Sequence, residues 1–159
     1  MTTAVEVFSQ YGVLVDGVSL TSRAAILALE DRMIELYGGG EHTETFPLTH
    51  RFADGVYARE ILLPAGTLVI GKIHRYAHLN IITKGRVAVL TEFGVEELEA
   101  PYTFTSLAGT KRVVFAYEDT IWTTLHGTQH TDPDTVEEDI ICKSFEEFDA
   151  LQLLIEEKL

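Results

Sequence analysis

The sequence predicts a mainly β protein, a sandwich, jelly roll or barrel of short strands with helices at both ends of the chain. Over residues 56–128, short β-branched and aromatic runs alternate with Gly, Pro or acidic breaks. No helical pattern separates these runs, which is typical of strands joined by turns. Apolar residues at helical spacing occur before and after this region instead.

Residues 1–45 are expected to form an extension made of a hairpin and a helix. Two apolar runs flank Asp16-Gly17, a pair that is typical of a tight hairpin turn. Thr21 or Ser22 can cap the helix that follows, and the glycines at 38–40 can end it. The polar stretch EHTETFPLTHRFADG is then expected to link this extension to the β region.

The β core is expected over residues 56–128, in the runs VYAREILL, TLVIGKIH, LNIIT, RVAVLTE, VEELE, YTFTS, KRVVFAY and TIWTTLH. Residues 133–159 are expected to be helical. Ser144 and Glu147 have the spacing of a capping box there, and an apolar stripe follows at Phe145, Phe148, Leu151 and Ile155. We therefore expect one domain over residues 1–159.

Composition limits the partners. The net charge is −13 and the 12 Lys and Arg residues are scattered, which argues against direct nucleic acid binding. The acidity either keeps the protein soluble or forms a face for a basic partner. No run approaches the ~20 apolar residues of a membrane span, and the N-terminus lacks a signal-peptide pattern, so we expect a soluble, cytoplasmic protein. Cys142 is the only cysteine, so any metal would have to use His, Asp or Glu.

The stretch GTLVIGKIHRYAHLNIITKG contains the most informative motif. Gly66, His74 and Gly85 have the spacing of a signature that runs Gly, five residues, His-x-His, three or four residues, Glu, six residues, Gly. In this frame the chain resembles the cupin superfamily. Two ligand positions differ, because Lys72 stands in place of the first histidine and His78 in place of the glutamate.

A second cupin signature resembles the stretch PYTFTSLAGTKRVVFA, in which Gly109 keeps the turn glycine. Arg112 stands where the third metal-binding histidine would be, and Ala116 where an asparagine would be. The resemblance implies a double-stranded β-helix, or jelly roll, with one divalent transition metal (Zn, Fe, Ni or Mn) at its mouth and a homodimer as its assembly. The chain also resembles small cupin-like proteins of bacteriophage and prophage genomes. Because cupins include both enzymes and binding modules, the fold does not select a function.

Three histidines are the candidate metal ligands. His74 is the one ligand carried over from the family pattern, and His78 follows four residues later. Strand alternation puts Trp122, Thr124 and His126 on one face of TIWTTLHGT. If this face looks into the barrel, His126 meets the other two histidines, and a three-histidine site with an open position results.

Other residues suggest a different occupant. Lys72 and Arg112 place positive charge where a metal should bind, and with the histidines they would attract a carboxylate or phosphate. Tyr57 and Trp122 complete the candidate ligand-binding set. Glu60 is the candidate acid or base if it faces the cavity, although Tyr57 and Arg59 share the opposite face of its strand.

Three functions stay open at this point. The first is a metal-dependent enzyme that acts on a small polar molecule. The second is a metal-free binding module for an anionic small molecule or nucleotide. The third is an acidic protein-interaction scaffold without catalysis.

Overall fold

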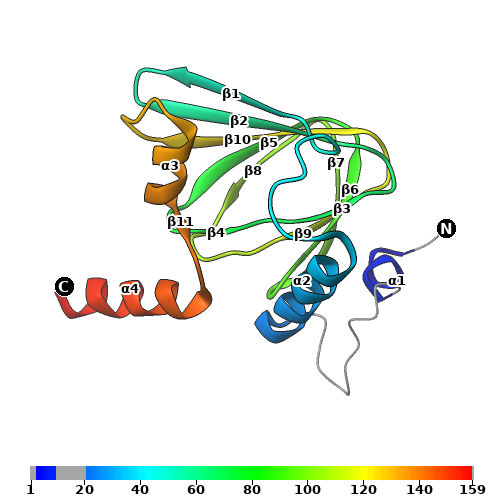
Figure 1. The fold of residues 1–159 in the computed structure, drawn as a ribbon, viewed down its shortest axis with the longest axis horizontal. Coiled ribbons are helices and arrows are strands. Elements are labelled where there is room, and N and C mark those ends of the chain that lie inside the picture. Colours follow the sequence, from blue (N-terminus) through cyan, green and yellow to red (C-terminus); the bar gives the residue numbers. More distant parts are fainter. Residues whose placement is uncertain (1–2, 10–20, 159) are drawn as a thin grey trace.

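The computed structural model describes residues 3–9 and 21–158. Their strands form two antiparallel sheets that lie face to face, with helices on the outside (Figure 1). The larger sheet has the order β1 (Leu48–Ala53), β2 (Val56–Leu63), β10 (Thr120–Gly127), β5 (His78–Lys84) and β8 (Tyr102–Ser106). The smaller sheet has the order β3 (Leu68–Ile70), β9 (Val113–Ala116), β6 (Arg86–Thr91) and β7 (Gly94–Glu99). The jelly roll expected from the sequence is therefore confirmed.

The space between the sheets is partly filled by an apolar core. Side chains of both sheets build it, namely Leu63, Ile82, Val87, Val89, Leu98, Val114, Ala116 and Trp122. On β6, Val87 and Val89 enter this core, whereas Ala88 and Leu90 point to the outer face of the sheet. This alternation follows from the strand period of two residues, and it makes both faces of the smaller sheet apolar.

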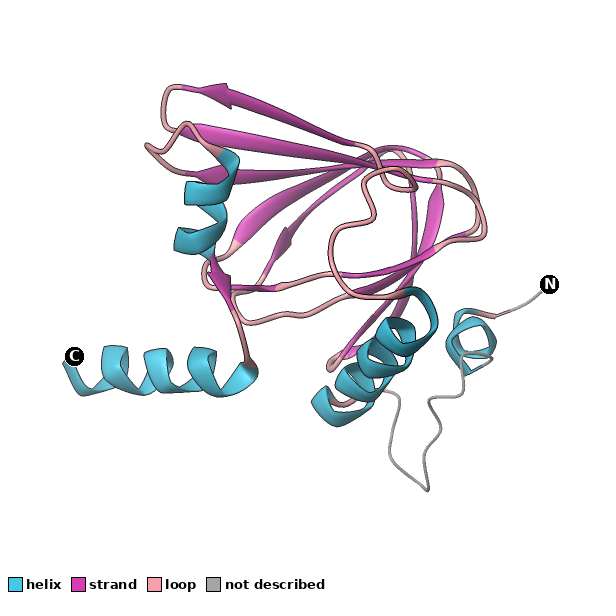
Figure 2. Ribbon diagram, viewed as in Figure 1, coloured by secondary structure: helices cyan, strands magenta, loops and turns pink. Residues whose placement is uncertain are grey.

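The outer face of the smaller sheet is covered by two helices, α1 (Ala4–Ser9) and α2 (Arg23–Tyr37), which are cyan in Figure 2. Their fully buried side chains are Phe8, Ile26 and Leu29. The sequence predicted α2 and its cap: the Ser22 hydroxyl accepts a hydrogen bond of 3.1 Å from the backbone N–H of Ala25. It did not predict α1, and the hairpin expected at Asp16-Gly17 lies outside the described residues.

The prediction of a linker over residues 41–55 is wrong for the second half of that range. Leu48–Ala53 is strand β1, which pairs with β2 in antiparallel register from Leu48↔Ile61 to Ala53↔Val56. Half of its sequence, LTHRFA, is polar, and most of its residues are exposed because the strand lies at the edge of the sheet. Polar residues are common on edge strands, where they oppose pairing with other chains.

The expected C-terminal helical segment is two helices separated by a short strand. These elements are α3 (Pro133–Ile140), β11 (Ile141–Cys142) and α4 (Phe145–Lys158). Strand β11 pairs with β4 (Ile73–His74) in a two-stranded ribbon. None of the helices in residues 3–9 and 21–158 has the length and apolar character needed to cross a membrane.

Helix α4 begins as the capping box predicted, and its first turn packs against the ribbon. The Ser144 hydroxyl accepts a hydrogen bond of 3.1 Å from the N–H of Glu147. Phe145 and Phe148 are buried against Ile73 and Cys142. The remainder of α4 extends away from the sheets (Figure 1), and the expected apolar stripe ends in an exposed Ile155.

Candidate metal centre and cavity

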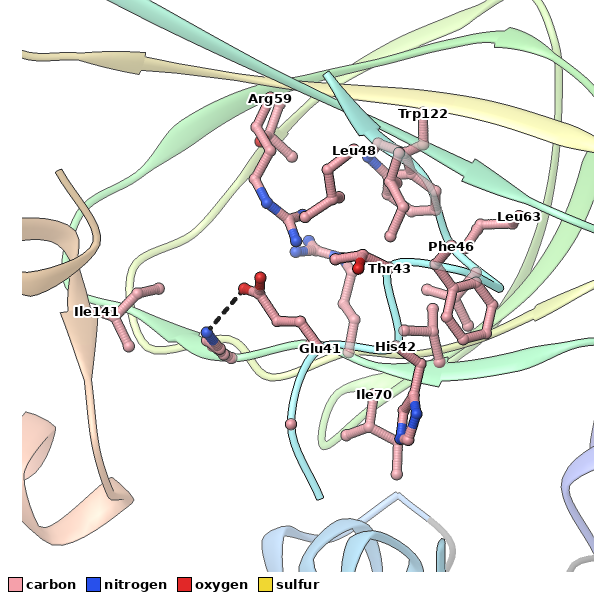
Figure 3. A pocket seen from close by; sticks show the side chains of 18 of the residues that line it. Glu41, His42, Thr43, Phe46, Leu48, Arg59, Leu63, Ile70, Trp122 and Ile141 are labelled. Carbon is pink, nitrogen blue, oxygen red and sulfur yellow. Dashed lines mark hydrogen bonds and ion pairs between the residues drawn. The ribbon is translucent and has the colours of Figure 1, made fainter. Parts of the chain in front are cut away.

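A cavity of about 850 Å³ lies between the sheets. Its walls are the inward faces of both sheets, and the loop at 38–46, between α2 and β1, runs along it. Figure 3 shows Glu41, Thr43 and Phe46 of this loop beside Arg59 and Trp122 of the larger sheet. A volume of this size suits a small organic molecule.

The strand register arranges the cavity side of the larger sheet in layers. In the first layer His126 is paired with Tyr57. In the second, Thr124 lies between Arg59 and Asn80, and in the third Trp122 lies between Ile61 and Ile82. Because alternate residues of a strand are about 6.8 Å apart, each layer is displaced by about that distance from the next. We call these the histidine, arginine and tryptophan layers.

Three histidines come together at the histidine layer. His74 ends β4, His78 begins β5, and His126 lies near the end of β10. Their ring centroids are 4.3 Å apart for His74 and His78, 4.7 Å for His78 and His126, and 5.2 Å for His74 and His126. One nitrogen of each ring lies within 4.8 Å of the others. His126 therefore faces the cavity, on the same side of β10 as Trp122 and Thr124.

All three imidazoles are kept uncharged at neutral pH. Burial lowers the pKa of His74 to about 2, and the charges of His78 and His126 act in the same direction. Burial also lowers the pKa of His78 to about 4 and that of His126 to about 4. A neutral imidazole has a lone pair on one nitrogen, which is the form that binds a metal.

Neighbouring groups orient two of the rings. Nδ1 of His78 lies 3.5 Å from the carbonyl oxygen of Tyr76, which can only accept, so Nδ1–H is the donor. The lone pair of His78 is then on Nε2. Nε2 of His126 lies 3.0 Å from the Thr124 hydroxyl; when Nε2–H donates to this hydroxyl, the lone pair for a metal is on Nδ1. Such partners fix the ring orientation of metal-binding histidines in other proteins.

This set of donors fits a transition metal. Zinc binds imidazole at about 2.0–2.1 Å, so a tetrahedral site needs the nitrogens about 3.4 Å apart. The ligand nitrogens of the three histidines lie within 4.8 Å of one another, so small side-chain rotations can bring them to this separation. Imidazole suits zinc, iron and nickel, and three protein ligands leave one position open for water or a ligand.

The two cations at the altered cupin positions lie in different surroundings. The Lys72 ammonium lies 3.3 Å from a carboxylate oxygen of Glu41, the dashed line in Figure 3, and also contacts Glu137. It is thus neutralised and is not available to a ligand as the sequence suggested. Arg112 lines the cavity, and its guanidinium lies 5.3 Å from the centroid of the Phe104 ring.

Tyr57 and Trp122 both line the cavity and are buried. The Tyr57 hydroxyl lies 2.6 Å from Nδ1 of His50. The Trp122 indole N–H donates a hydrogen bond of 3.0 Å to the side-chain oxygen of Asn80. Both polar groups are therefore satisfied by the protein, and their rings form walls of the cavity.

Glu60 is not part of the cavity wall. Because side chains alternate along β2, Tyr57 and Arg59 point inward and Glu60 points outward. Its carboxylate forms an ion pair of 2.9 Å with Arg51. Glu60 is consequently not placed to act as the acid or base that the sequence suggested.

Arg59, Asn80 and Glu41 are among the cavity residues that were missing from the predicted set. Arg59 shares a face with Tyr57, and Asn80 follows His78 by two residues, so alternation gave a signal for both. Glu41 gave none, because it lies in a loop whose path over the cavity has no local pattern in the sequence.

Solved structures with a similar fold include cupin-superfamily proteins. Ectoine synthase from P. lautus is 13% identical with a TM-score of 0.51, over 62% of this chain and 75% of that one. KdgF from Halomonas sp. is 14% identical with a TM-score of 0.48, over 58% of this chain and 86% of that one. A cupin-superfamily protein from Desulfitobacterium hafniense DCB-2 is 11% identical with a TM-score of 0.46, over 60% and 86%.

At these identities the likeness is one of fold, and the chain has the cupin jelly roll. Comparison with protein-family models gives no match, and comparison with curated proteins gives none. Function must therefore be argued from the cavity itself.

Proposed function

We propose that this protein binds one divalent transition metal through His74, His78 and His126 and uses it to bind and activate a small polar molecule. The observation that supports the proposal is the convergence of three uncharged imidazoles on the wall of a cavity of about 850 Å³. Each neutral imidazole has a lone pair on one nitrogen, and one metal ion would accept all three lone pairs at once.

The surrounding residues would hold this site in shape. Thr124 and the Tyr76 carbonyl orient two of the ligands. The Tyr57 ring stacks on His126, with centroids 6.0 Å apart and an interplanar angle of 28°. A metal bound with an open position polarises an oxygen of the bound molecule or lowers the pKa of a water.

The test is the metal content of untagged protein by mass spectrometry. About one equivalent of a transition metal is expected in the wild type, and none in His74→Ala, His78→Ala or His126→Ala. His50→Ala is the matched control, because His50 lines the same cavity outside the cluster and should leave the metal in place. A wild type that stays metal-free after incubation with zinc, iron, nickel and manganese would overturn the proposal.

A second candidate is a metal-free binding module for an anionic small molecule. It is favoured by Arg112, a cation at a position where a cupin metal ligand would stand. In this case an anion should raise the melting temperature equally with and without a chelator. Under the metal proposal, the chelator abolishes most of the ligand-induced stabilisation.

A further inference from the structure

We infer that the ligand of this cavity carries a carboxylate that Arg59 and Arg112 bind together, one layer away from the three histidines, and an apolar body that packs on Trp122. The inference deepens the proposed function and rests on it, because the carboxylate site lies between the apolar part of the cavity and the metal centre. It names a ligand class, an apolar carboxylic acid.

The two guanidinium groups reach the cavity from opposite sheets. Arg59 belongs to β2 of the larger sheet, whereas Arg112 directly precedes β9 of the smaller sheet. The backbone at Arg112 is fixed, since its carbonyl accepts a hydrogen bond of 2.8 Å from the N–H of Gly71. An anion between the sheets would therefore be held from both sides.

Neither guanidinium forms an ion pair with a carboxylate in the described part of the chain. Within residues 3–9 and 21–158, no carboxylate oxygen lies within 4.0 Å of Arg59 or Arg112. The third cavity cation, Lys72, differs in having both Glu41 and Glu137 as partners. A partly buried charge without a partner is costly, and burial lowers the pKa of Arg112 accordingly. An anionic ligand would supply the missing partner.

Both arginines lie at the level of the arginine layer. The Arg112 guanidinium is 5.3 Å from the centroid of the Phe104 ring, and Phe104 is paired with Asn80 of that layer. In the larger sheet, Arg59 is paired with Thr124, two residues from His126. The carboxylate site is thus displaced by about 6.8 Å along the strands from the histidine layer. One small molecule can span both sites.

Charge favours a carboxylate over a phosphate. Glu41 reaches into the same part of the cavity as Arg59 (Figure 3) and reduces its positive potential. A singly charged group is therefore better matched than a doubly charged one. The planar fork of arginine also fits a carboxylate through two parallel hydrogen bonds.

The next layer requires an apolar ligand body. Trp122 presents only its ring, because its N–H already donates to Asn80. Other apolar side chains of both sheets line this part of the cavity, namely Ile61, Leu63, Val69 and Val114. A polar ligand body here would lose its hydration without gaining hydrogen bonds.

The test compares two rigid probes of equal shape, benzoate and its neutral amide, benzamide, by calorimetry on metal-loaded protein. The carboxylate should bind at least about tenfold more tightly than the amide. Arg59→Gln and Arg112→Gln should each weaken carboxylate binding by about 10- to 100-fold and leave amide binding unchanged. Arg51→Gln is the control, since Arg51 pairs with Glu60 on the outer face of the same sheet.

Metal content is measured on every variant, so the two proposals fail separately. Equal binding of acid and amide, no binding of the acid at millimolar concentration, or no effect of the arginine variants would overturn this inference, even with metal bound. Tighter binding of phenyl phosphate than of the carboxylate would overturn the choice of carboxylate. If the wild type is metal-free and still binds the acid, and both arginine variants weaken this binding, the carboxylate site is supported and the metal proposal is contradicted. Arg59→Lys and Arg112→Lys keep the charge and guard against effects of misfolding.

Discussion

The imidazole of His126 lies between the Tyr57 ring, 6.0 Å away, and the Thr124 hydroxyl, 3.0 Å from its Nε2. These contacts orient the ring, while burial removes its charge at neutral pH. A ligand that is already neutral releases no proton when a metal binds at pH 7. Metal affinity should consequently change little between neutral and weakly acidic pH.

Acid should destabilise the metal-free protein through these residues. The pKa of His126 is lowered from 6.5 to about 4 in the folded protein. Between these two pH values, the His126 side chain binds a proton in the unfolded chain but not in the folded chain. Stability is therefore lost as the pH falls through the window from about 6.5 to 4. The full effect for His126 alone is about 3 kcal/mol.

The measurement is urea unfolding of metal-free wild type and His126→Asn at pH 7 and pH 4.5. Because carboxylates titrate in both proteins, only the difference between them is used. The wild type should lose about 2–3 kcal/mol more than the variant on acidification. Equal losses would show that His126 titrates normally in the folded protein.

At the scale of elements, the two glycines that bound the central motif have different roles. Both have positive φ, 81° at Gly66 and 96° at Gly85. A side chain at Gly66 would meet open space. At Gly85, between β5 and β6, a Cβ would clash with Thr120 and would lie 2.6 Å from the carbonyl oxygen of Asp119. Gly85 is therefore needed both for the positive φ of the turn and for the close approach of β10.

Alanine substitution separates these two contributions. Gly66→Ala should cost about 1–2 kcal/mol of the free energy of unfolding, from backbone strain alone. Gly85→Ala should lose about 1–3 kcal/mol beyond that, from overpacking against β10. Urea denaturation of both variants measures the difference. Equal losses would mean that the chain at residues 119–120 moves aside without cost.

Strand β4, which ends in His74, depends on the C-terminal segment. It pairs with β11 through Ile141↔His74 and Cys142↔Ile73. The backbone N–H of Arg75 also donates a hydrogen bond of 2.6 Å to the carbonyl of Ile140. Phe148 of α4 packs against this ribbon and against the turn at Gly109, whose N–H donates to the His74 carbonyl at 2.8 Å.

Phe148→Ala should therefore weaken the metal site from a distance. We expect a loss of about 3 kcal/mol in stability and about tenfold in metal affinity. Urea unfolding and competition with a chromophoric chelator measure the two quantities. Leu154→Ala, at an exposed position of the same helix, should change neither. A destabilised variant with normal metal affinity would show that α4 does not position His74.

At the scale of the whole molecule, local patterns predicted the parts that depend on strand period. The alternation placed Trp122, Thr124 and His126 on one face of β10 because a strand repeats every two residues, and this face lines the cavity. The same rule put Tyr57 and Arg59 on one face of β2 and Glu60 on the other, and the face with Arg59 lines the cavity. Where the period decides orientation, it is the better guide.

Other parts depend on contacts between residues far apart in the chain. Lys72 is neutralised by Glu41 and Glu137, which lie 31 and 65 residues away, so no local pattern reveals the ion pairs. β11 has two residues and exists through its pairing with β4. β1 was mistaken for a linker because its edge position permits polar residues. The homodimer and the cytoplasmic location stay predictions.

The pairing of His74 with Ile141 also has a consequence for synthesis. A ribosome adds about 5–20 residues per second, so the interval between translation of residues 74 and 141 is about 3–13 s. During that time β4 lacks its strand partner. We expect metal uptake through all three histidines to be complete only after translation of the C-terminal segment. A premature stop before residue 141 would leave a chain with every histidine of the site but without the strand that pairs with His74.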